Sequence, residues 1–300
     1  MKAMILAAGL GTRLRPLTLN RPKALIPVGN VPIFDRIIEY LKTYGISDLV
    51  VNAHHHHEQI VEHLNGGRPF GLNIDVRIEP DILGTGGGIK NTEDFWDNAP
   101  FIVMNGDILS NINLRKAYEA HKRSESLATL ILHDQPPFNQ IKIDDQNNIT
   151  HIADENLAGR LAFTGIHIID PKLMGRIPEN VFSNIIHWYR ELIGEGTPPN
   201  AYISTGHEWR DIGTIESYVL ANKEALHGKS ILCSPDCRID SSAVLKDWAV
   251  IGSETVLEQG VEVRRSILWE KVKVKRGVKV IDSIVTSSKD VEHDLIDEIL

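Results

Sequence analysis

The sequence has little cysteine, no long apolar run and no excess of positive charge, and each absence narrows the class of protein. Its two cysteines, Cys233 and Cys237, lack the second pair that would complete a zinc site or a disulfide framework. No apolar run approaches the roughly 18–20 residues that a membrane-spanning helix needs. The formal net charge of −8 argues against a nucleic-acid binder that works by broad electrostatic attraction. We therefore expect a protein of the reducing cytoplasm, without nucleic-acid or membrane partners.

The sequence has enough hydrophobic residues for one large folded domain and a smaller additional region. The chain has 300 residues, of which 42% are hydrophobic. Strand-like runs alternate with helical patterns in the first half, at Ala3–Leu6, Asp48–Ala53, Ile74–Ile78, Phe101–Asn105 and Leu127–Leu132. This alternation predicts an α/β domain with a Rossmann-like, mixed or parallel sheet flanked by helices, and ligands at the carboxyl ends of its strands.

The C-terminal part follows a different pattern, with branched aliphatic residues recurring every six positions. They are Val244, Val250, Val256, Leu268, Val274 and Val280, and Glu262 is the one exception at that phase. A period of six is typical of a hexapeptide β-helix, here expected to be short and left-handed. An ordinary antiparallel β tail is the alternative. The predicted domains are therefore residues 1–228, the α/β domain, and 229–300, the β-helix tail.

The segment Leu6–Leu17 brings glycine and positive charge together directly after the first predicted strand. Gly9 and Gly11 allow backbone N–H groups to converge on an anion. Arg13 offers a fork of donors to phosphate oxygens, and Lys23 adds a compact charge. Such a local concentration of cations in an acidic chain predicts a site for several phosphates, as in a nucleoside triphosphate.

A dinucleotide-binding fingerprint is the competing interpretation of this loop. Its third glycine would stand at the position of Leu14, and no acidic residue ends the second strand, where Asn52 and Ala53 stand. This sequence therefore lacks the third glycine and the acidic residue that would confirm a dinucleotide-binding dehydrogenase.

A second glycine cluster, Gly84–Gly88, follows the third predicted strand and contains Thr85. Glycines there would allow a base or ribose to approach the backbone closely. Glu79, at the end of that strand, is a candidate acceptor for a base edge, and a carboxylate suits the adjacent N–H donors of guanine. A solvated strand end is the alternative interpretation of Glu79.

Two aspartates are candidate metal ligands. Asp107 follows the strand Phe101–Asn105, and Asp211 stands in a polar loop before the last predicted helix. Mg²⁺ is usually held by one or two carboxylates together with substrate phosphates and water, so this pair would suffice. Helix capping is the alternative for Asp211. The run His54–His57 is interpreted as a polar loop rather than a metal site.

Taken in order, these motifs resemble the sugar-1-phosphate nucleotidyltransferases, also called nucleoside-diphosphate-sugar pyrophosphorylases. The resemblance covers residues 1–225 and is carried by Gly9–Leu17, Pro22-Lys23, Leu83–Gly88, Asn105–Asp107, Phe163–Gly165 and Trp209–Gly213. The N-terminal part is similar to N-acetylmuramate-1-phosphate uridylyltransferases, and the tail is similar to that of mannose-1-phosphate guanylyltransferases. The implied reaction is the Mg²⁺-dependent transfer of a nucleotidyl group from GTP or UTP to a sugar-1-phosphate, with release of pyrophosphate.

The resemblance also implies roles for individual residues. Its nucleotide-binding residues are Ala8, Gly9, Gly11, Thr12, Gly84 and Thr85. Its catalytic residues are Arg13, Lys23 and Asp107, its metal ligands are Asp107 and Asp211, and its sugar-binding residues are Gly165 and Glu155. Arg13 would hold the departing phosphates and Lys23 the α-phosphate, so that catalysis is positioning and charge neutralisation. The tail would serve assembly of a homo-oligomer.

One departure from the family pattern concerns the sugar phosphate. Many members hold it with the lysine of a Glu-Lys-Pro motif, whereas this chain reads Ile152–Asn156 at that place and has no lysine there. Arg160 is a candidate substitute. The missing lysine also motivates an alternative, a non-catalytic regulatory or scaffolding protein that binds a nucleotide sugar. Neither the base nor the sugar follows from the sequence.

Overall fold

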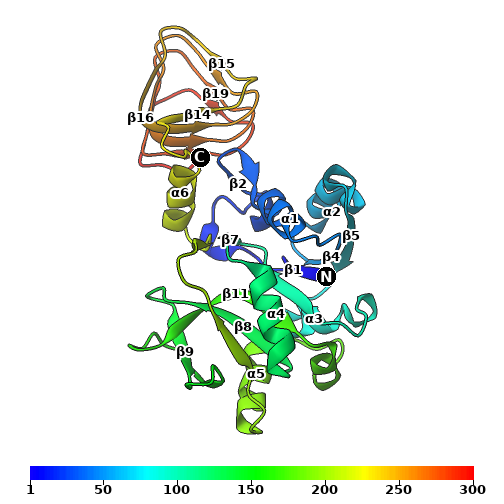
Figure 1. Cartoon of the computed structure of the whole chain (residues 1–300). Helices are drawn as coiled ribbons and strands as arrows, with labels where there is room; N and C mark the ends of the chain where they lie inside the picture. Colours follow the sequence, from blue (N-terminus) through cyan, green and yellow to red (C-terminus); the bar gives the residue numbers. More distant parts are fainter. The chain divides into compact units, whose positions relative to one another are not determined.

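The computed structural model describes all 300 residues, and the chain divides into two compact units (Figure 1). The first unit comprises Met1–Leu10 and Arg36–Asp211, and the second comprises Gly11–Asp35 and Ile212–Leu300. The chain thus leaves the first unit within the glycine loop and returns to it in the first long helix. None of the helices has the length and apolar character that crossing a membrane requires.

The first unit is built on a nine-stranded mixed sheet. Seven strands follow the order β10-β9-β11-β6-β1-β4-β5, while β8 pairs with β11 and β12 pairs with β8. The strands are β1 Lys2–Leu6, β4 Asp48–Ala53, β5 Asn73–Ile78, β6 Phe101–Asn105, β8 Ala128–His133, β9 Asn139–Ile143, β10 Ile149–Ile152, β11 Leu161–Ile169 and β12 Asn200–Ile203. β1 is parallel to β4 and β6, whereas β11 is antiparallel to β6, β8 and β9. The predicted α/β fold with a mixed sheet is confirmed.

Helices flank this sheet, and two of them begin at a polar side chain that caps the first turn. They are α1 Ile33–Thr43, α2 His57–Leu64, α3 Gly84–Lys90, α4 Leu114–Ser124 and α5 Ile185–Gly194. The Asn113 side chain accepts a hydrogen bond from Lys116 N at the start of α4, and Asn184 accepts one from Ile186 N at the start of α5. These two caps fix where α4 and α5 begin.

The central strands are buried on both faces, which fixes the position of their carboxyl ends. Met4, Val50 and Val103 are each 0% exposed. Continuous apolar runs of this kind are expected of parallel strands covered by helices on both sides. The loops that follow β1, β4 and β6 therefore start from a rigid edge.

The second unit contains a C-terminal set of parallel strands, here called the strand stack. Its members are β14 Ile231–Cys233, β15 Arg238–Ile239, β16 Val244–Ile251, β17 Val256–Leu257, β18 Glu262–Leu268, β19 Lys273–Val274, β20 Lys279–Ile281, β21 Ile284–Val285, β22 Asp290–Val291 and β23 Leu295–Ile296. They form a six-stranded and a four-stranded sheet in which every pair is parallel. The antiparallel tail considered above is therefore wrong.

The pairing register of the strand stack is regular. Val256 pairs with Lys273 and Lys273 with Asp290, so each partner lies 17 residues further along the chain. At the six-residue positions, Val250, Leu268, Val274 and Val280 are buried, whereas Val244 is 42% exposed. Most of the apolar repeat therefore lies in the interior of the stack.

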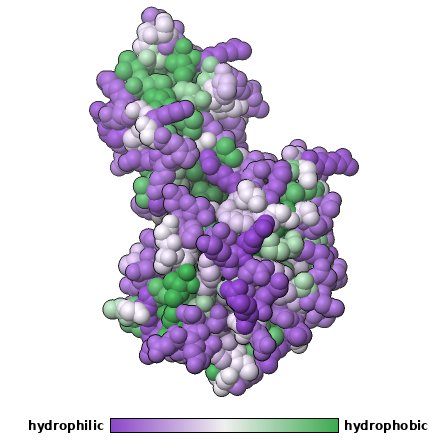
Figure 2. Space-filling view, in the orientation of Figure 1, coloured by the Kyte–Doolittle hydropathy of each residue, from purple (hydrophilic) through white to green (hydrophobic).

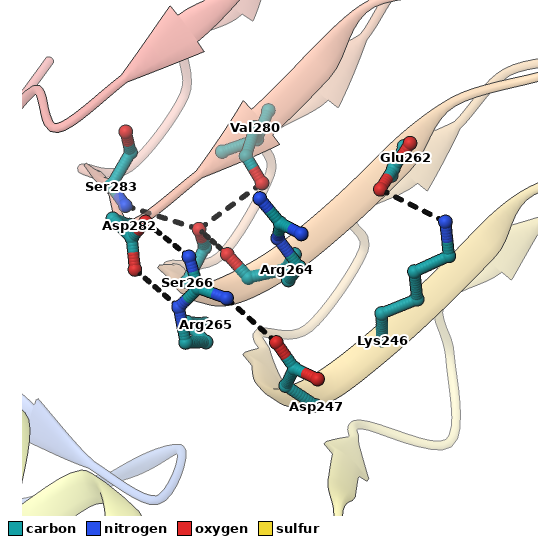
Figure 3. Close-up of polar contacts among 9 residues, drawn as sticks. All are labelled: Lys246, Asp247, Glu262, Arg264, Arg265, Ser266, Val280, Asp282 and Ser283. Atoms are coloured by element: carbon teal, nitrogen blue, oxygen red, sulfur yellow. Dashed lines mark hydrogen bonds and ion pairs between the residues drawn. The ribbon is translucent and has the colours of Figure 1, made fainter.

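Charged side chains join successive strands at the surface of the stack (Figure 3). Arg265 donates to Asp247 Oδ2 at 2.7 Å and, through Nε, to Asp282 Oδ1 at 2.6 Å. All three residues have positive φ: 58° for Asp247, 48° for Arg265 and 51° for Asp282. The hydrogen bond from Arg265 lowers the pKa of the Asp282 carboxyl. Since left-handed backbone is costly for arginine, these ion pairs help to hold a turn that the repeat requires.

The segment Gly11–Asp35 is anchored within the second unit by buried hydrogen bonds. Tyr218, on α6 (Ile215–Glu224), donates from its hydroxyl to Pro27 O at 2.9 Å and accepts from Trp269 Nε1 at 2.8 Å. Burial raises the pKa of Tyr218, so its hydroxyl keeps its proton. Asn222, also fully buried, accepts from Gly29 N at 2.9 Å. The short hairpin of β2 (Pro27–Val28) and β3 (Val31–Pro32) is thereby tied to α6.

An ion pair adds a second anchor for this segment. Arg21 pairs with Glu270 and also donates to Ser287 Oγ at 2.9 Å. Its guanidinium lies 4.9 Å from the centre of the Trp269 ring. Residues of the strand stack thus hold the stretch of chain that carries Lys23.

Candidate active site

A buried polar network fixes the start of the loop after β1. Ala7 N donates to Asn52 Oδ1 at 2.9 Å, and Asn52 Nδ2 donates to Glu79 Oε1 at 2.7 Å. The second oxygen of Glu79 accepts from Leu83 N at 2.9 Å. The network joins the carboxyl ends of β1, β4 and β5 to the residue before α3. It therefore sets the path of the backbone toward Ala8, which is buried, and Gly9, which is exposed.

This network gives Glu79 a role that differs from the expected contact with a base. Glu79 is 1% exposed, and its two carboxylate oxygens already accept from Asn52 and Leu83. The solvated strand end considered for Glu79 is therefore wrong, and its contact with a base edge stays a prediction. The available signal for the network was a pair of polar residues, Asn52 and Glu79, at the ends of neighbouring strands whose carboxyl ends share one edge.

We expect Asn52→Ala to lower the free energy of unfolding by about 2–3 kcal/mol, because it leaves a buried carboxylate oxygen and the Ala7 N–H without partners. Chemical denaturation measures this loss. The matched control is Asn73→Ala, at an exposed position of β5 where the side chain donates only to Asp48, and it should change stability by less than about 0.5 kcal/mol. Equal effects of the two substitutions would contradict the proposed importance of the network.

The second glycine cluster forms the start of α3 and packs against residues 181–183. Gly86 N and Gly87 N donate to Ser183 O at 2.8 and 3.2 Å. A Cβ on Gly87 would lie 2.6 Å from Val181 O, so this close approach requires glycine. Thr85 Oγ1 accepts from Ile185 N at 3.0 Å. The expected contacts of Gly84 and Thr85 with a nucleoside remain predictions, since part of this cluster is explained by packing.

The two candidate metal ligands lie on a short ribbon at the end of β6. Gly106 N donates to Leu6 O at 2.8 Å, and Asp107 follows immediately. The ribbon pairs β7 (Ile108–Ser110) with β13 (Trp209–Asp211), in a register that places Asp211 opposite Ile108. Asp107 therefore directly precedes the residue that pairs with Asp211, and both aspartates are half-buried.

This donor set fits a hard divalent cation such as magnesium and offers none of the histidine or cysteine ligands that zinc or copper prefers. Two carboxylates supply hard oxygen ligands, and no group of three or more His, Cys, Asp or Glu side chains is placed to hold a metal. The histidine run does not form such a group either, because His54 Nδ1 contacts the Glu79 carbonyl oxygen at 2.7 Å and His57 begins α2. A divalent cation at the aspartate pair would complete its coordination with phosphates and water.

A cavity of about 380 Å³ opens beside this ribbon and is lined by Asp211, Asn105 and Gly165 among others. Gly165 has φ +73°, and a Cβ there would lie 2.7 Å from Asn105 Nδ2, so only glycine fits. Trp209 Nε1 donates to Thr164 O at 2.8 Å, and its ring lies edge-on to Phe138 at 5.8 Å. The cavity thus combines aromatic walls with the oxygen of a candidate metal ligand. We call it the Gly165 pocket.

The two residues predicted to bind the sugar, Gly165 and Glu155, differ in whether they line this pocket. Gly165 lines it, whereas Glu155 is exposed and borders a neighbouring groove. The expectation that both residues contact a sugar is therefore better supported for Gly165 than for Glu155.

A buried histidine lies behind the pocket wall. His167 stands 5.4 Å from the ring of Phe163, and its Nδ1 contacts the Tyr189 hydroxyl. Burial lowers the pKa of His167 to about 3, so the imidazole is neutral near pH 7. His167 is therefore a packing residue and not an acid catalyst, and no motif in the sequence distinguished it.

The remaining predicted phosphate ligands belong to the second unit. Gly11, at φ +63°, precedes the short 3₁₀ turn Thr12–Leu14, and Thr18 Oγ1 donates to Gly11 O at 2.9 Å. Arg13 is exposed, and the half-buried Lys23 begins the 3₁₀ turn Lys23–Leu25. Arg13 therefore lies within one tight turn and Lys23 at the start of another, which limits the freedom of their backbone.

An α/β sheet that ends in a glycine loop, an aspartate pair and a concave pocket defines a class of enzymes that handle phosphorylated substrates at strand ends. The family model for nucleotidyl transferases matches residues 2–228. The chain belongs to this family of enzymes, and the resemblance to sugar-1-phosphate nucleotidyltransferases is confirmed.

Individual relatives agree with this assignment. The UTP–glucose-1-phosphate uridylyltransferase of Synechocystis is 26% identical, over 95% of this chain and 87% of its own. A mannose-1-phosphate guanyltransferase of Neurospora crassa is 27% identical, over 95% of this chain and 86% of its own. The solved structure of HddC from Yersinia pseudotuberculosis complexed with GMP-PN is similar with a TM-score of 0.63 and 26% identity, covering 74% of this chain and 98% of that one.

Proposed function

We propose that this protein transfers a nucleotidyl group from GTP or UTP to a sugar-1-phosphate, giving a nucleoside-diphosphate sugar and pyrophosphate with Mg²⁺ as the cofactor. The observation that carries the proposal is the pairing of β7 with β13: Asp107 directly precedes β7, and Asp211, opposite Ile108, lines the Gly165 pocket. Relatives named for both uridylyl and guanylyl transfer support the two candidate bases equally.

The proposed reaction needs no covalent intermediate on the protein. The backbone of Ala8–Thr12 and the guanidinium of Arg13 would hold the phosphates that leave as pyrophosphate, and Lys23 would neutralise the α-phosphate. Gly84 and Thr85 would border the nucleoside, and Gly165 the sugar. A bound Mg²⁺ would supply charge neutralisation at the phosphates through Asp107 and Asp211. The phosphate oxygen of the sugar then attacks the α-phosphorus in line with the departing pyrophosphate.

The strand stack is proposed to be a left-handed hexapeptide β-helix over residues 229–300, following a catalytic domain over residues 1–228. Partners 17 residues apart correspond to about three six-residue repeats for each turn of chain. The family match, which ends at residue 228, supports this boundary. The cytoplasmic location expected from the sequence stays a prediction.

Apolar residues on the stack are consistent with a role in assembly. Ile239, Val244 and Ile296 are 37%, 42% and 58% exposed, and apolar atoms gather over the stack on the face drawn in Figure 2. Exposed apolar surface is a feature of protein interfaces. Light scattering of the full chain would show whether it forms the proposed homo-oligomer, and a monomer at every concentration tested would exclude it.

The reaction is tested by pyrophosphate release over a grid of substrates. Each of the four nucleoside triphosphates is combined with mannose-, glucose-, galactose-, N-acetylglucosamine- and N-acetylmuramate-1-phosphate, with and without Mg²⁺. We expect one strongly preferred pair and no release after chelation of the metal. If the folded protein releases no pyrophosphate with any pair of substrates but still binds a nucleotide sugar, the result would instead favour a regulatory protein.

A further inference from the structure

The Gly165 pocket contains a single strongly basic side chain. Among its lining residues there is one arginine, Arg190, and no lysine. The only other lining residue able to carry positive charge is His187, one turn earlier on α5. A sugar-1-phosphate brings a multiply charged phosphate into this space, and an anion buried against protein needs a cationic or N–H partner.

The backbone and a carboxylate hold the Arg190 guanidinium in a defined orientation. Nε donates to Ile152 O at 3.2 Å, and Nη2 pairs with Asp154 Oδ1 at 2.5 Å. These contacts leave Nη1 for a ligand. A planar guanidinium that is already held at two of its nitrogens loses little further conformational freedom when it binds phosphate.

Asp154 does not block the site for a phosphate. The Arg190 side chain is 41% exposed and that of Asp154 is 87% exposed, so their pair lies in contact with solvent. Exposed ion pairs contribute little to stability, so an incoming phosphate can displace the Asp154 carboxylate at small cost.

Arg160, the substitute expected from the sequence, is directed elsewhere. Its Nη1 donates to Gln140 O at 3.0 Å and contacts His151 Nδ1 at 2.8 Å. Arg160 is absent from the lining of the Gly165 pocket. The role expected for Arg160 therefore stays a prediction, and the pocket lining favours Arg190 over it.

We propose that Arg190 binds the phosphate of the sugar-1-phosphate and so takes the place of the missing lysine. The inference rests on the proposed function, since it concerns the acceptor substrate of that reaction. It assigns the contact to helix α5, whose Arg190 is held against the strand end where the sequence departs from the family. It also explains how the pocket can remain functional without a lysine.

The test is a comparison of Arg190→Gln with Arg160→Gln in the full-length protein. For Arg190→Gln we expect the KM of the preferred sugar-1-phosphate to rise about 30-fold, the loss typical of a charge-assisted hydrogen bond, with the KM of the nucleotide within about twofold of wild type. Arg190→Lys, which keeps the charge but not the fork, should restore part of this loss. Arg160→Gln, the matched control, should leave both KM values within about twofold.

The outcomes separate this inference from the proposed function. If the wild type is active and Arg190→Gln keeps its KM for the sugar-1-phosphate, or Arg160→Gln shows the rise instead, the assignment of Arg190 is overturned while the reaction stands. If the wild type is inactive, the proposed function fails, and calorimetry with mannose-1-phosphate and glucose-1-phosphate then decides about Arg190. Binding to wild type that is lost in Arg190→Gln would support it, and absence of binding to wild type would overturn it.

Discussion

Asp107→Asn is expected to lower kcat for pyrophosphate release by about 10³-fold while leaving the fold intact, because the substitution removes a charged oxygen ligand from the aspartate pair. Asp107 follows β6, whose neighbours in the sheet are β1 and β11, and it stands beside the strand that pairs with Asp211. The half-buried side chain lies at the edge of a rigid sheet, so asparagine fits without rearrangement. The loss should therefore appear in turnover and in the Mg²⁺ requirement, and not in the unfolding temperature.

The measurement is initial-rate pyrophosphate release over a titration of Mg²⁺, with the preferred pair of substrates. Asp145→Asn is the matched control, because Asp145 is exposed in the turn between β9 and β10 and should retain full activity. If Asp107→Asn turns over at the wild-type rate at limiting Mg²⁺, Asp107 is not a metal ligand. An unfolding temperature that falls together with the activity would point to a structural defect instead.

Lys23→Ala should lower kcat/KM by about 10²- to 10³-fold, since it removes the positive charge proposed to neutralise the α-phosphate as negative charge develops there. Lys23 begins a 3₁₀ turn in a segment whose backbone is anchored by Tyr218 and Asn222. The substitution is therefore expected to leave that backbone in place. Lys23→Arg keeps the charge but presents it as a wider fork, so it should recover only part of the activity.

Lys271→Ala is the matched control for Lys23, because Lys271 is 57% exposed on the strand stack and makes only a surface ion pair with Glu254 at 3.7 Å. Steady-state kinetics of the three lysine variants with the preferred substrates give the comparison. Activity near that of wild type in both Lys23→Ala and Asp107→Asn would refute the proposed mechanism.

The features that could be predicted from the sequence are those set by residues close together in the chain. The apolar runs in the sequence predict β1, β4 and β6, because a parallel strand that is buried on both faces is apolar along its length. The glycine loop after β1 and Asp107 after β6 follow from the same reasoning, because ligands collect at the carboxyl ends of parallel strands. The six-residue period likewise predicts the buried positions of the strand stack.

Features that depend on distant segments could not be predicted in the same way. Glu79 ends a strand, and only the folded chain shows that Asn52 and the start of α3 cover it. The glycines of α3 were interpreted as a place where a base or ribose approaches the backbone; the structure shows residues 181–183 packed against them, and the contact with a nucleoside stays a prediction. The choice of Arg190 over Arg160 depends on how α5 packs beside β10, which no local pattern encodes.

The anchoring of the segment Gly11–Asp35 by Tyr218, Arg21 and Glu270 gives the strand stack a thermodynamic connection to the segment that carries the proposed phosphate ligands Arg13 and Lys23. The segment carries the two cations proposed to hold the triphosphate, and its order is maintained by hydrogen bonds to the stack and to α6. Any event on the stack that tightens or loosens this anchor would change the affinity for nucleotide. Because coupling free energies are reciprocal, nucleotide binding would alter that event by the same factor.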